Sequence, residues 1–235
     1  MTEPLTTDEI AGLRQYSTTT VSNVIEVLVP ERRGRGFTIR PVYCAFPDLK
    51  PMVGYAKTVT IKASERSSLS PEAAQKQRGD YLDYLAAGPH PSICVVQDID
   101  TPAGQGTFWG KRNAVVHKKL GCDGVLTNGI MRDADTIVPD FQILCGGLGV
   151  SHSFVHTVEF GAPVEIHGLT VASGDLIHGD AHGAVIVPAE VVRDIPKALD
   201  YLKRRGAAVG DALDDPGFTV EKLKAAYQLA DDIKV

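Results

Sequence analysis

The segment from Gly121 to Asp135 contains the side chains best suited to chemistry. Within it, residues 125–127 form a short apolar run that predicts a strand, and Asn128-Gly129 is typical of the turn that ends one. Arg132-Asp133 follows directly after the turn. A loop at a strand end is held by the scaffold yet open to ligands, so opposite charges placed there favour a binding or catalytic site. The alternative is a surface ion pair in which Asp133 caps a helix over 134–138.

A second candidate feature is a loop that is predicted to turn into a helix. It consists of Gly110, Lys111, Arg112 and Asn113. Free N–H groups at a helix start, together with the helix dipole, favour a carboxylate or a phosphate. If Arg132 reaches the same place, its guanidinium and these N–H groups can hold one carboxylate together. Asp133 could bind Mg²⁺, which often uses one or two carboxylates and keeps several waters. This combination suits a 2-oxo acid, whose enolate Arg132 would stabilise.

Histidines form a third candidate feature. His152 and His156 have the i, i+4 spacing that suits zinc on a helix, and Glu159 could add a ligand if the helix continued. Residues 151–158 are equally consistent with a strand, and structural histidines are the alternative. His178 precedes the segment Asp180-Ala-His-Gly183, and His182 lies within it. This segment is interpreted as a turn before a strand over 184–187, with a secondary active-site or interface role as the alternative.

Composition excludes several classes of protein. The chain has 235 residues and a net charge of −5, so it lacks the basic footprint of a nucleic-acid or anionic-membrane binder. No apolar run approaches the ~20 residues of a membrane helix, and the start of the chain lacks a signal-peptide pattern. The four cysteines show no Cys-x-x-Cys pairing and are expected to be buried free thiols. These features predict a cytoplasmic location.

Hydrophobic spacing and turn signals predict the elements that position these residues. Helices are expected from residue 7, from 17–20 to Pro30, and over 72–87, 113–120, 189–204 and 219–230. Strands are expected over 38–45, 54–63, 92–97, 125–127, 141–144, 163–166, 169–171 and 183–188. Residues 98–110 are expected to form a loop. Strands alternate with helices in the middle and cluster as hairpins later, which predicts one layered α/β domain over 1–235 with mixed sheets and helical ends.

Several motifs together resemble the RraA-like family, which includes 4-hydroxy-4-methyl-2-oxoglutarate and 4-carboxy-4-hydroxy-2-oxoadipate aldolases. The central match is Phe108-Trp-Gly110, Gly121-x-x-Gly124 and Thr127-Asn-Gly129-x-x-Arg132-Asp133-x-Asp135. Further matches are Ser17-Thr18 with Val21-Ser22-Asn23, and Gly174-Asp175-Leu176-Ile177 with Asp180-x-x-Gly183. The resemblance covers most of residues 10–190 and leaves the helices of 189–235 outside this core.

The resemblance implies a β/β/α fold, a homotrimer or a dimer of trimers, and active sites between subunits. It also implies class II aldolase chemistry with Mg²⁺ or Mn²⁺ that releases pyruvate, with oxaloacetate decarboxylation as a side activity. By position, Gly110 to Asn113 would bind the pyruvyl group through backbone N–H groups. Arg132 would bind it and stabilise the enolate, and Asp133 would be the metal ligand.

The chain departs from the family pattern at three acidic positions. Lys111 stands where relatives usually have an acid after Trp-Gly, and Asn128 and Asn23 stand where Asp is common. Two further hypotheses therefore stand beside the aldolase. One is a non-catalytic binding protein, since some RraA-like proteins inhibit ribonuclease E by contact. The other is a related lyase on a different 2-oxo or sugar acid, with Lys111 and Arg112 recognising a second carboxylate.

Overall fold

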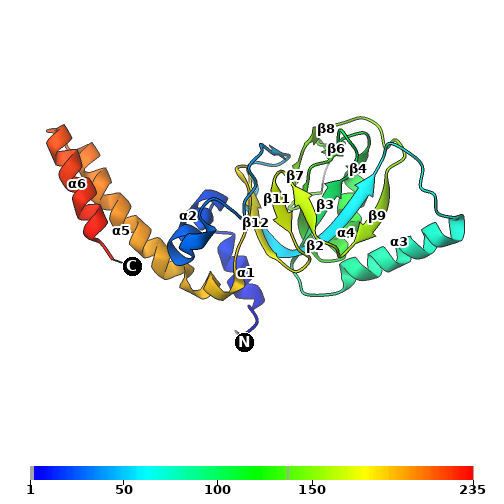
Figure 1. Ribbon diagram of the computed structural model, residues 1–235, viewed down its shortest axis with the longest axis horizontal. Helices are drawn as coiled ribbons and strands as arrows, with labels where there is room; N and C mark the ends of the chain where they lie inside the picture. Colours follow the sequence, from blue (N-terminus) through cyan, green and yellow to red (C-terminus); the bar gives the residue numbers. More distant parts are fainter. Residues whose placement is uncertain (1–2, 137, 235) are drawn as a thin grey trace.

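The computed structural model describes residues 3–136 and 138–234 and consists of a sheet-based body and a helical arm. The body holds the strands together with α3 (Pro71–Ala86) and α4 (Lys111–Lys119). The arm is the pair α5 (Ile195–Asp214) and α6 (Val220–Asp232), which extends away from the body (Figure 1). The layered α/β fold with mixed sheets and helical ends is thus confirmed.

An eight-stranded mixed sheet forms the centre of the body. Its order is β1-β7-β5-β3-β2-β12-β13, and β9 pairs with the far part of β2. Strands β2, β3, β5 and β7 are parallel, whereas β1, β9, β12 and β13 run antiparallel to their neighbours. The strands are β1 (Tyr43–Cys44), β2 (Met52–Lys62), β3 (Ser92–Asp98), β5 (Cys122–Thr127), β7 (Gln142–Cys145), β9 (His156–Phe160), β12 (Leu176–Asp180) and β13 (Gly183–Ile186).

The parallel strands are buried on both faces, which explains their continuous apolar sequences. In β3, for example, residues 92–96 are all buried. Parallel neighbours need a long crossover, and here α3 connects β2 to β3 while α4 lies between β3 and β5 in the chain. Helix α4 packs on β5, whereas α3 is buried only at Tyr81 and Leu85 and its N-terminal end projects away from the sheets (Figure 1).

Two smaller sheets complete the body. One is the hairpin β10 (Val164–Ile166) and β11 (Leu169–Val171). The other is a parallel three-stranded sheet of β4 (Thr107–Trp109), β6 (Ile130–Met131) and β8 (Gly147–Leu148), in the order β4-β6-β8. This second sheet brings the ends of two distant loops together and thereby builds the candidate site.

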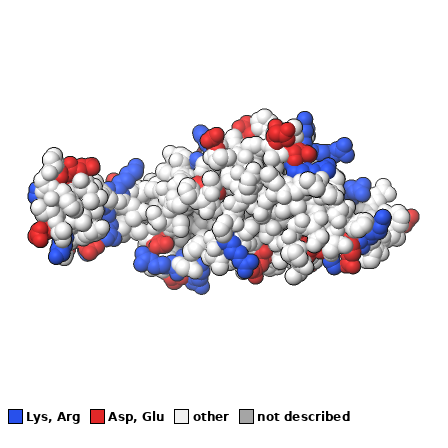
Figure 2. Space-filling model, turned by 90° about the horizontal axis from the view of Figure 1, so that it is seen from above, with Lys and Arg blue, Asp and Glu red and all other residues white. Residues whose placement is uncertain are grey.

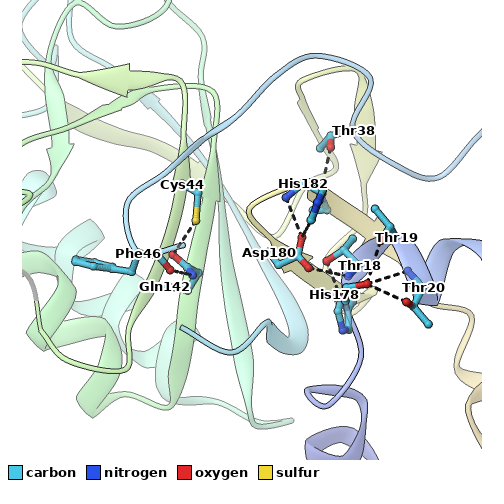
Figure 3. A network of polar contacts seen from close by, with 12 residues as sticks. Thr18, Thr19, Thr20, Thr38, Cys44, Phe46, Gln142, His178, Asp180 and His182 are labelled. Atoms are coloured by element: carbon cyan, nitrogen blue, oxygen red, sulfur yellow. Dashed lines mark hydrogen bonds and ion pairs between the residues drawn. The ribbon is translucent and has the colours of Figure 1, made fainter. Parts of the chain in front are cut away.

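Helices α1 (Thr7–Leu13) and α2 (Thr18–Leu28) are tied to β12 by a buried polar network (Figure 3). The Thr18 N–H donates to Asp180 Oδ2 at 2.8 Å, and Thr18 Oγ1 lies 3.0 Å from His178 Nδ1. Asp180 Oδ1 also accepts from the His182 N–H at 2.9 Å. The expected turn role of Asp180 is confirmed, and this carboxylate additionally caps the start of α2.

The arm is amphipathic but leaves much apolar surface uncovered. Ala226 and Ala230 of α6 are buried against α5. Leu213, Phe218, Val220, Tyr227 and Leu229 are exposed. Figure 2 shows charges of both signs on the arm and a narrow connection to the body. The first part of α5 packs on α2, and this contact anchors the arm.

The structure differs from several sequence predictions. The strand expected over 38–45 is reduced to Tyr43–Cys44, because its neighbours bond to the β10–β11 turn and to β13 instead. The loop expected over 98–110 contains β4, and β12 was not expected. The helix expected over 189–204 begins as a 3₁₀ segment, Ala189–Asp194, and then continues as α5 to Asp214. Residues 151–158 form a loop followed by the start of β9.

The structure also bears on two expectations from composition, which concern membrane helices and the cysteines. Among the described helices, none combines the length and apolar character needed to cross a membrane. All four cysteines are free thiols; Cys94, Cys122 and Cys145 are buried, and Cys44 is partly exposed.

Candidate active site

The pairing of β4 with β6 places the two candidate loops side by side. Trp109 is the register partner of Met131, so the next residues, Gly110 and Arg132, are neighbours. The Arg132 N–H donates to the Trp109 carbonyl at 2.9 Å, so the β4–β6 hydrogen bonding continues to Arg132. Trp109 and Met131 are fully buried, which makes the junction a rigid support for the residues that follow.

A cavity of about 840 Å³ opens at this junction. Every residue proposed from the sequence as a site residue lines it, namely Gly110, Lys111, Arg112, Asn113, Arg132 and Asp133. The remaining lining residues are Phe108, Val115, Val116, His152 and Val155. The cavity therefore has a charged end and an apolar end, as many small-molecule sites have.

Asp133 has an unusual backbone conformation that aims its carboxylate toward Gly110. Its φ is +59°, in the left-handed region that non-glycine residues adopt infrequently. A Cβ on Gly110 would lie 2.9 Å from Asp133 Oδ2 and 3.4 Å from Arg132 Cγ. A side chain at Gly110 would therefore displace the Asp133 carboxylate, which occupies the space that a Cβ would fill.

No helix starts at Asp133 in the described part of the chain. The Thr136 N–H donates to the Asp133 carbonyl at 3.0 Å and closes a turn, so the Asp133 side chain is not a helix cap. Arg132 Nε lies 3.8 Å from Asp133 Oδ2, and the side chains are 34% and 43% exposed. This contact is too long for a hydrogen bond, which leaves both groups available to a ligand.

The start of α4 adds positive charge and free donors to the same cavity. Its first residue follows Gly110, which has no side chain to cap the helix, and the first turn contains no acid. Lys111 and Arg112 form no ion pair with any described residue. Helix N–H groups, the helix dipole and these two cations all favour an anion.

Buried hydrogen bonds hold α4 in position. Asn113 Nδ2 donates to the Phe108 carbonyl at 2.9 Å, and His117 Nδ1 lies 2.8 Å from the Asn113 carbonyl. His117 Nε2 lies 2.7 Å from the Tyr81 hydroxyl of α3. Burial lowers the pKa of His117 to about 4, so its ring is neutral at pH 7 and accepts from Tyr81.

The asparagines that replace family acids are placed differently from Lys111. Asn128 accepts from the Asp98 N–H at 2.8 Å and donates to the Asp98 carbonyl at 2.9 Å, so it joins the ends of β5 and β3. Asn23 is exposed on α2, outside the lining of the cavity. Lys111 alone among the three changes the charge of the cavity itself.

The histidine candidates do not form a metal cluster. His152 lines the cavity, with its Nδ1 3.1 Å from the Thr107 carbonyl, whereas His156 begins β9. Within residues 3–136 and 138–234, no group of three or more His, Cys, Asp or Glu side chains could hold a metal ion. The structural alternative for these histidines is therefore favoured over zinc.

Sequence reasoning missed the apolar end of the cavity. Phe108 is adjacent to the recognised Trp-Gly motif, so its neighbourhood was visible in the sequence. His152 and Val155 come from the loop after β8, and no local pattern links them to Gly110. Their position depends on β8 pairing with β6, which is a long-range contact.

Residues 18–186 match the family model of RraA-like proteins, which is described as Aldolase/RraA. Protein DlpA of Legionella pneumophila is 21% identical over 182 residues, which cover 75% of this chain. The match spans only 28% of the length of DlpA.

Solved structures share the fold. An uncharacterised protein from Pseudomonas syringae pv. tomato superposes with a TM-score of 0.69 at 20% identity and covers 96% of both chains. RraAS2 of Streptomyces coelicolor, described as an unusual member of the RNase ES inhibitor RraA protein family, gives a TM-score of 0.64 at 20% identity. That alignment covers 88% of this chain and 98% of the other.

Proposed function

Because the chain belongs to the RraA-like family, we propose that it is a divalent-metal-dependent aldolase that cleaves a pyruvyl-containing oxo acid, such as 4-hydroxy-4-methyl-2-oxoglutarate, to pyruvate. The observation that carries the proposal is the convergence of the α4 start, Arg132 and Asp133 on one cavity. These groups come from two loops that only the β4–β6 pairing brings together. An anion site beside a free carboxylate is what a metal-assisted reaction of a 2-oxo acid requires.

Each residue has a role that follows from its position. The N–H groups of residues 111–113 and the Arg132 guanidinium bind the carboxylate of the pyruvyl end. Arg132 also faces the oxygen on which negative charge develops, so it stabilises the enolate more than the ground state. Lys111 and Arg112 keep the charged end of the cavity positive and attract acidic substrates.

Asp133 is the residue suited to hold the metal. Its carboxylate is the one acidic group among the described residues that line the cavity, and the missing side chain of Gly110 leaves its Oδ2 open. Mg²⁺ and Mn²⁺ accept a single protein carboxylate when waters and substrate oxygens complete the coordination. When bound, the ion would supply positive charge for the ketone and enolate oxygens.

The proposed reaction breaks the C3–C4 bond of the substrate. The C4 hydroxyl loses its proton and becomes a carbonyl, and the electron pair of the broken bond forms the enolate of pyruvate. Protonation at C3 then gives pyruvate. Oxaloacetate would pass through the same enolate with loss of carbon dioxide, so decarboxylation is the expected side activity.

The open cavity also fits an assembly in which a neighbouring copy completes the site. Several apolar side chains on the body are exposed, including Leu148, Val150 and Phe154. We expect a homotrimer or a dimer of trimers, which the mass of the protein in solution would establish. A monomer at micromolar concentration would contradict this expectation.

The direct test is release of pyruvate from oxaloacetate and from 4-hydroxy-4-methyl-2-oxoglutarate, with Mg²⁺, Mn²⁺ and EDTA compared. Turnover that the chelator abolishes and either metal restores is the expected result. Absence of turnover of both acids with both metals would contradict the proposal.

A second candidate function is contact regulation of a ribonuclease. Lys111 favours it, because a cation in place of the usual acid makes the charged end of the cavity less suited to a metal. RraAS2, which has the same fold, is described as belonging to a family of RNase ES inhibitors. Stoichiometric capture of a ribonuclease by the purified chain, together with absent turnover, would favour this function.

The substrate range depends on the same two cations. If Lys111 and Arg112 recognise a second carboxylate, Lys111→Glu will change the preference between mono- and dicarboxylic substrates more than the affinity for Mg²⁺. A change in metal affinity alone would show that Lys111 acts on the ion.

A further inference from the structure

A second cavity lies directly beside the first. Its volume is about 450 Å³, and it shares four lining residues with the first cavity: Phe108, Asn113, Val116 and Val155. Its other walls come from α3 and the loop before it, α4 and β9, and they include Tyr81, Leu82 and His117. The two cavities therefore adjoin at these four residues, close to Gly110.

The polar groups of the second cavity are largely paired within the protein. Tyr81 and His117 hydrogen-bond to each other, and the Asn113 amide donates to Phe108. Gln77 Nε2 donates to the Val158 carbonyl at 3.1 Å. In the first cavity two adjacent cations, Lys111 and Arg112, have no ionic partner among the described residues, whereas in the second cavity this holds for a single exposed cation, Arg78.

The apolar side chains of the second cavity are open to water. Leu82 is 38% exposed and Val116 is 36% exposed, and Phe108 and Val155 are partly exposed. Arg78 contributes to the lining but is itself exposed. Covering such surface with an apolar group gains roughly 25 cal/mol per Å². A carboxylate would gain no new partner from the paired groups, and the unpaired cation Arg78 already has access to water.

We propose that the second cavity binds an apolar substituent on C4 of the substrate, aromatic or branched aliphatic, while the carboxylates stay with the cations of the first cavity. This inference rests on the proposed function, because it assumes that the pyruvyl end lies at Gly110. The substrate class is thus a 4-hydroxy-2-oxo acid that carries a bulky hydrocarbon group at C4.

Binding of two unreactive acids tests the assignment in the presence of Mg²⁺. The probes are 2-oxobutanoate and 4-phenyl-2-oxobutanoate, which share the pyruvyl end and differ by a phenyl ring. Calorimetry is expected to show at least about ten-fold tighter binding of the phenyl compound, since burying the ring is worth more than 1.4 kcal/mol. Equal dissociation constants would overturn the inference.

Leu82→Trp provides the matched perturbation. Leu82 lines the second cavity and not the first, so a larger side chain there should remove most of the preference for the phenyl compound and leave 2-oxobutanoate binding unchanged. Leu69→Trp is the control, because Leu69 is similarly exposed at 42% but lines neither cavity. Equal effects of the two variants would contradict the assignment.

The remaining outcomes separate this inference from the proposed function. If 2-oxobutanoate fails to bind at all, the pyruvyl site itself is wrong and both proposals fall. If 2-oxobutanoate binds, but Leu82→Trp changes only the mass of the assembly, the second cavity is a contact between copies and only the inference falls.

Discussion

The cavity and the arm differ in the space around their glycines and in the pairing of their charged side chains. A Cβ on Gly110 would meet Asp133 Oδ2 at 2.9 Å, whereas Gly206 and Gly210 of α5 have nothing within 4 Å of that position. The arm pairs its charges internally, for instance Arg205 with Asp231 at 2.6 Å. Lys111 and Arg112 at the cavity have no such partner in the described part of the chain.

This difference indicates what each region is built for. Paired surface charges each add about 0–1 kcal/mol to stability and bind nothing further. Unpaired cations that lie beside free helix N–H groups can form ion pairs and hydrogen bonds with a bound anion. Changes at the cavity should therefore affect turnover more than folding, and changes in the arm should affect folding more than turnover.

The largest expected effect is at Asp133. Asp133→Asn removes the charge that would hold the metal and should lower chelator-sensitive pyruvate release by at least about 100-fold. Asp135→Asn is the control, because Asp135 is exposed and does not line the cavity. Less than a two-fold change in Asp133→Asn, with circular dichroism unchanged, would remove Asp133 from the mechanism.

The next effect concerns the support beneath α4. Since the pKa of folded His117 is about 4 and an unfolded histidine titrates near 6.5, the unfolded state binds the extra proton first as the pH falls. The free energy of unfolding should therefore decrease by roughly 2–3 kcal/mol from this group between pH 7 and pH 4.

Urea unfolding of the wild type and of His117→Gln measures this contribution. The variant lacks the titrating ring, so its stability should fall less steeply over this pH range than that of the wild type. Profiles with the same slope would show that another group causes the acid sensitivity.

A smaller effect is expected at Gly110. Gly110→Ala forces Asp133 or Arg132 to move by several tenths of an ångström, and such misplacement should lower kcat/KM by about ten-fold. Steady-state pyruvate release measures it. Retention of full activity would mean that the approach of Asp133 to Gly110 is not required.

The smallest effect is expected in the arm. Gly210→Ala replaces a helical glycine where nothing obstructs a Cβ, so it should raise stability by at most about 1 kcal/mol and leave turnover unchanged. Thermal unfolding and the same pyruvate assay test both statements. Loss of turnover in this variant would show that the arm takes part in the site.

Local patterns predicted most of the fold. The buried parallel strands and α2, with its Ser17 cap and Pro30 stop, follow from composition and capping residues alone. The short strand β4 was not predicted, because its partner β6 lies beyond α4 and β5 in the chain. Strand β12 was not predicted either, although one of its two partners, β13, follows it directly and the other, β2, lies far away in the chain. The extension of α5 to Asp214 was not predicted either, because α5 continues away from the body and packs on α6, a long-range contact.

The part of the candidate site that lies within local sequence motifs was predictable. Gly110, Arg132 and Asp133 were visible as a glycine before a helix and a charge pair after a strand. The left-handed backbone of Asp133 and the second cavity could not be read from the chain. Both depend on how separate elements pack, and α3, β9 and the loop after β8 carry no signal that connects them.

The most direct test of the pyruvyl–metal site is Mn²⁺ binding, measured through the electron paramagnetic resonance signal of the free ion. The wild type and Asp135→Asn should bind Mn²⁺ at one site per chain, and pyruvate should strengthen this binding. Asp133→Asn should bind at least about 100-fold more weakly. Equal Mn²⁺ binding by all three proteins would contradict the assignment of Asp133 and the metal-dependent reaction built on it.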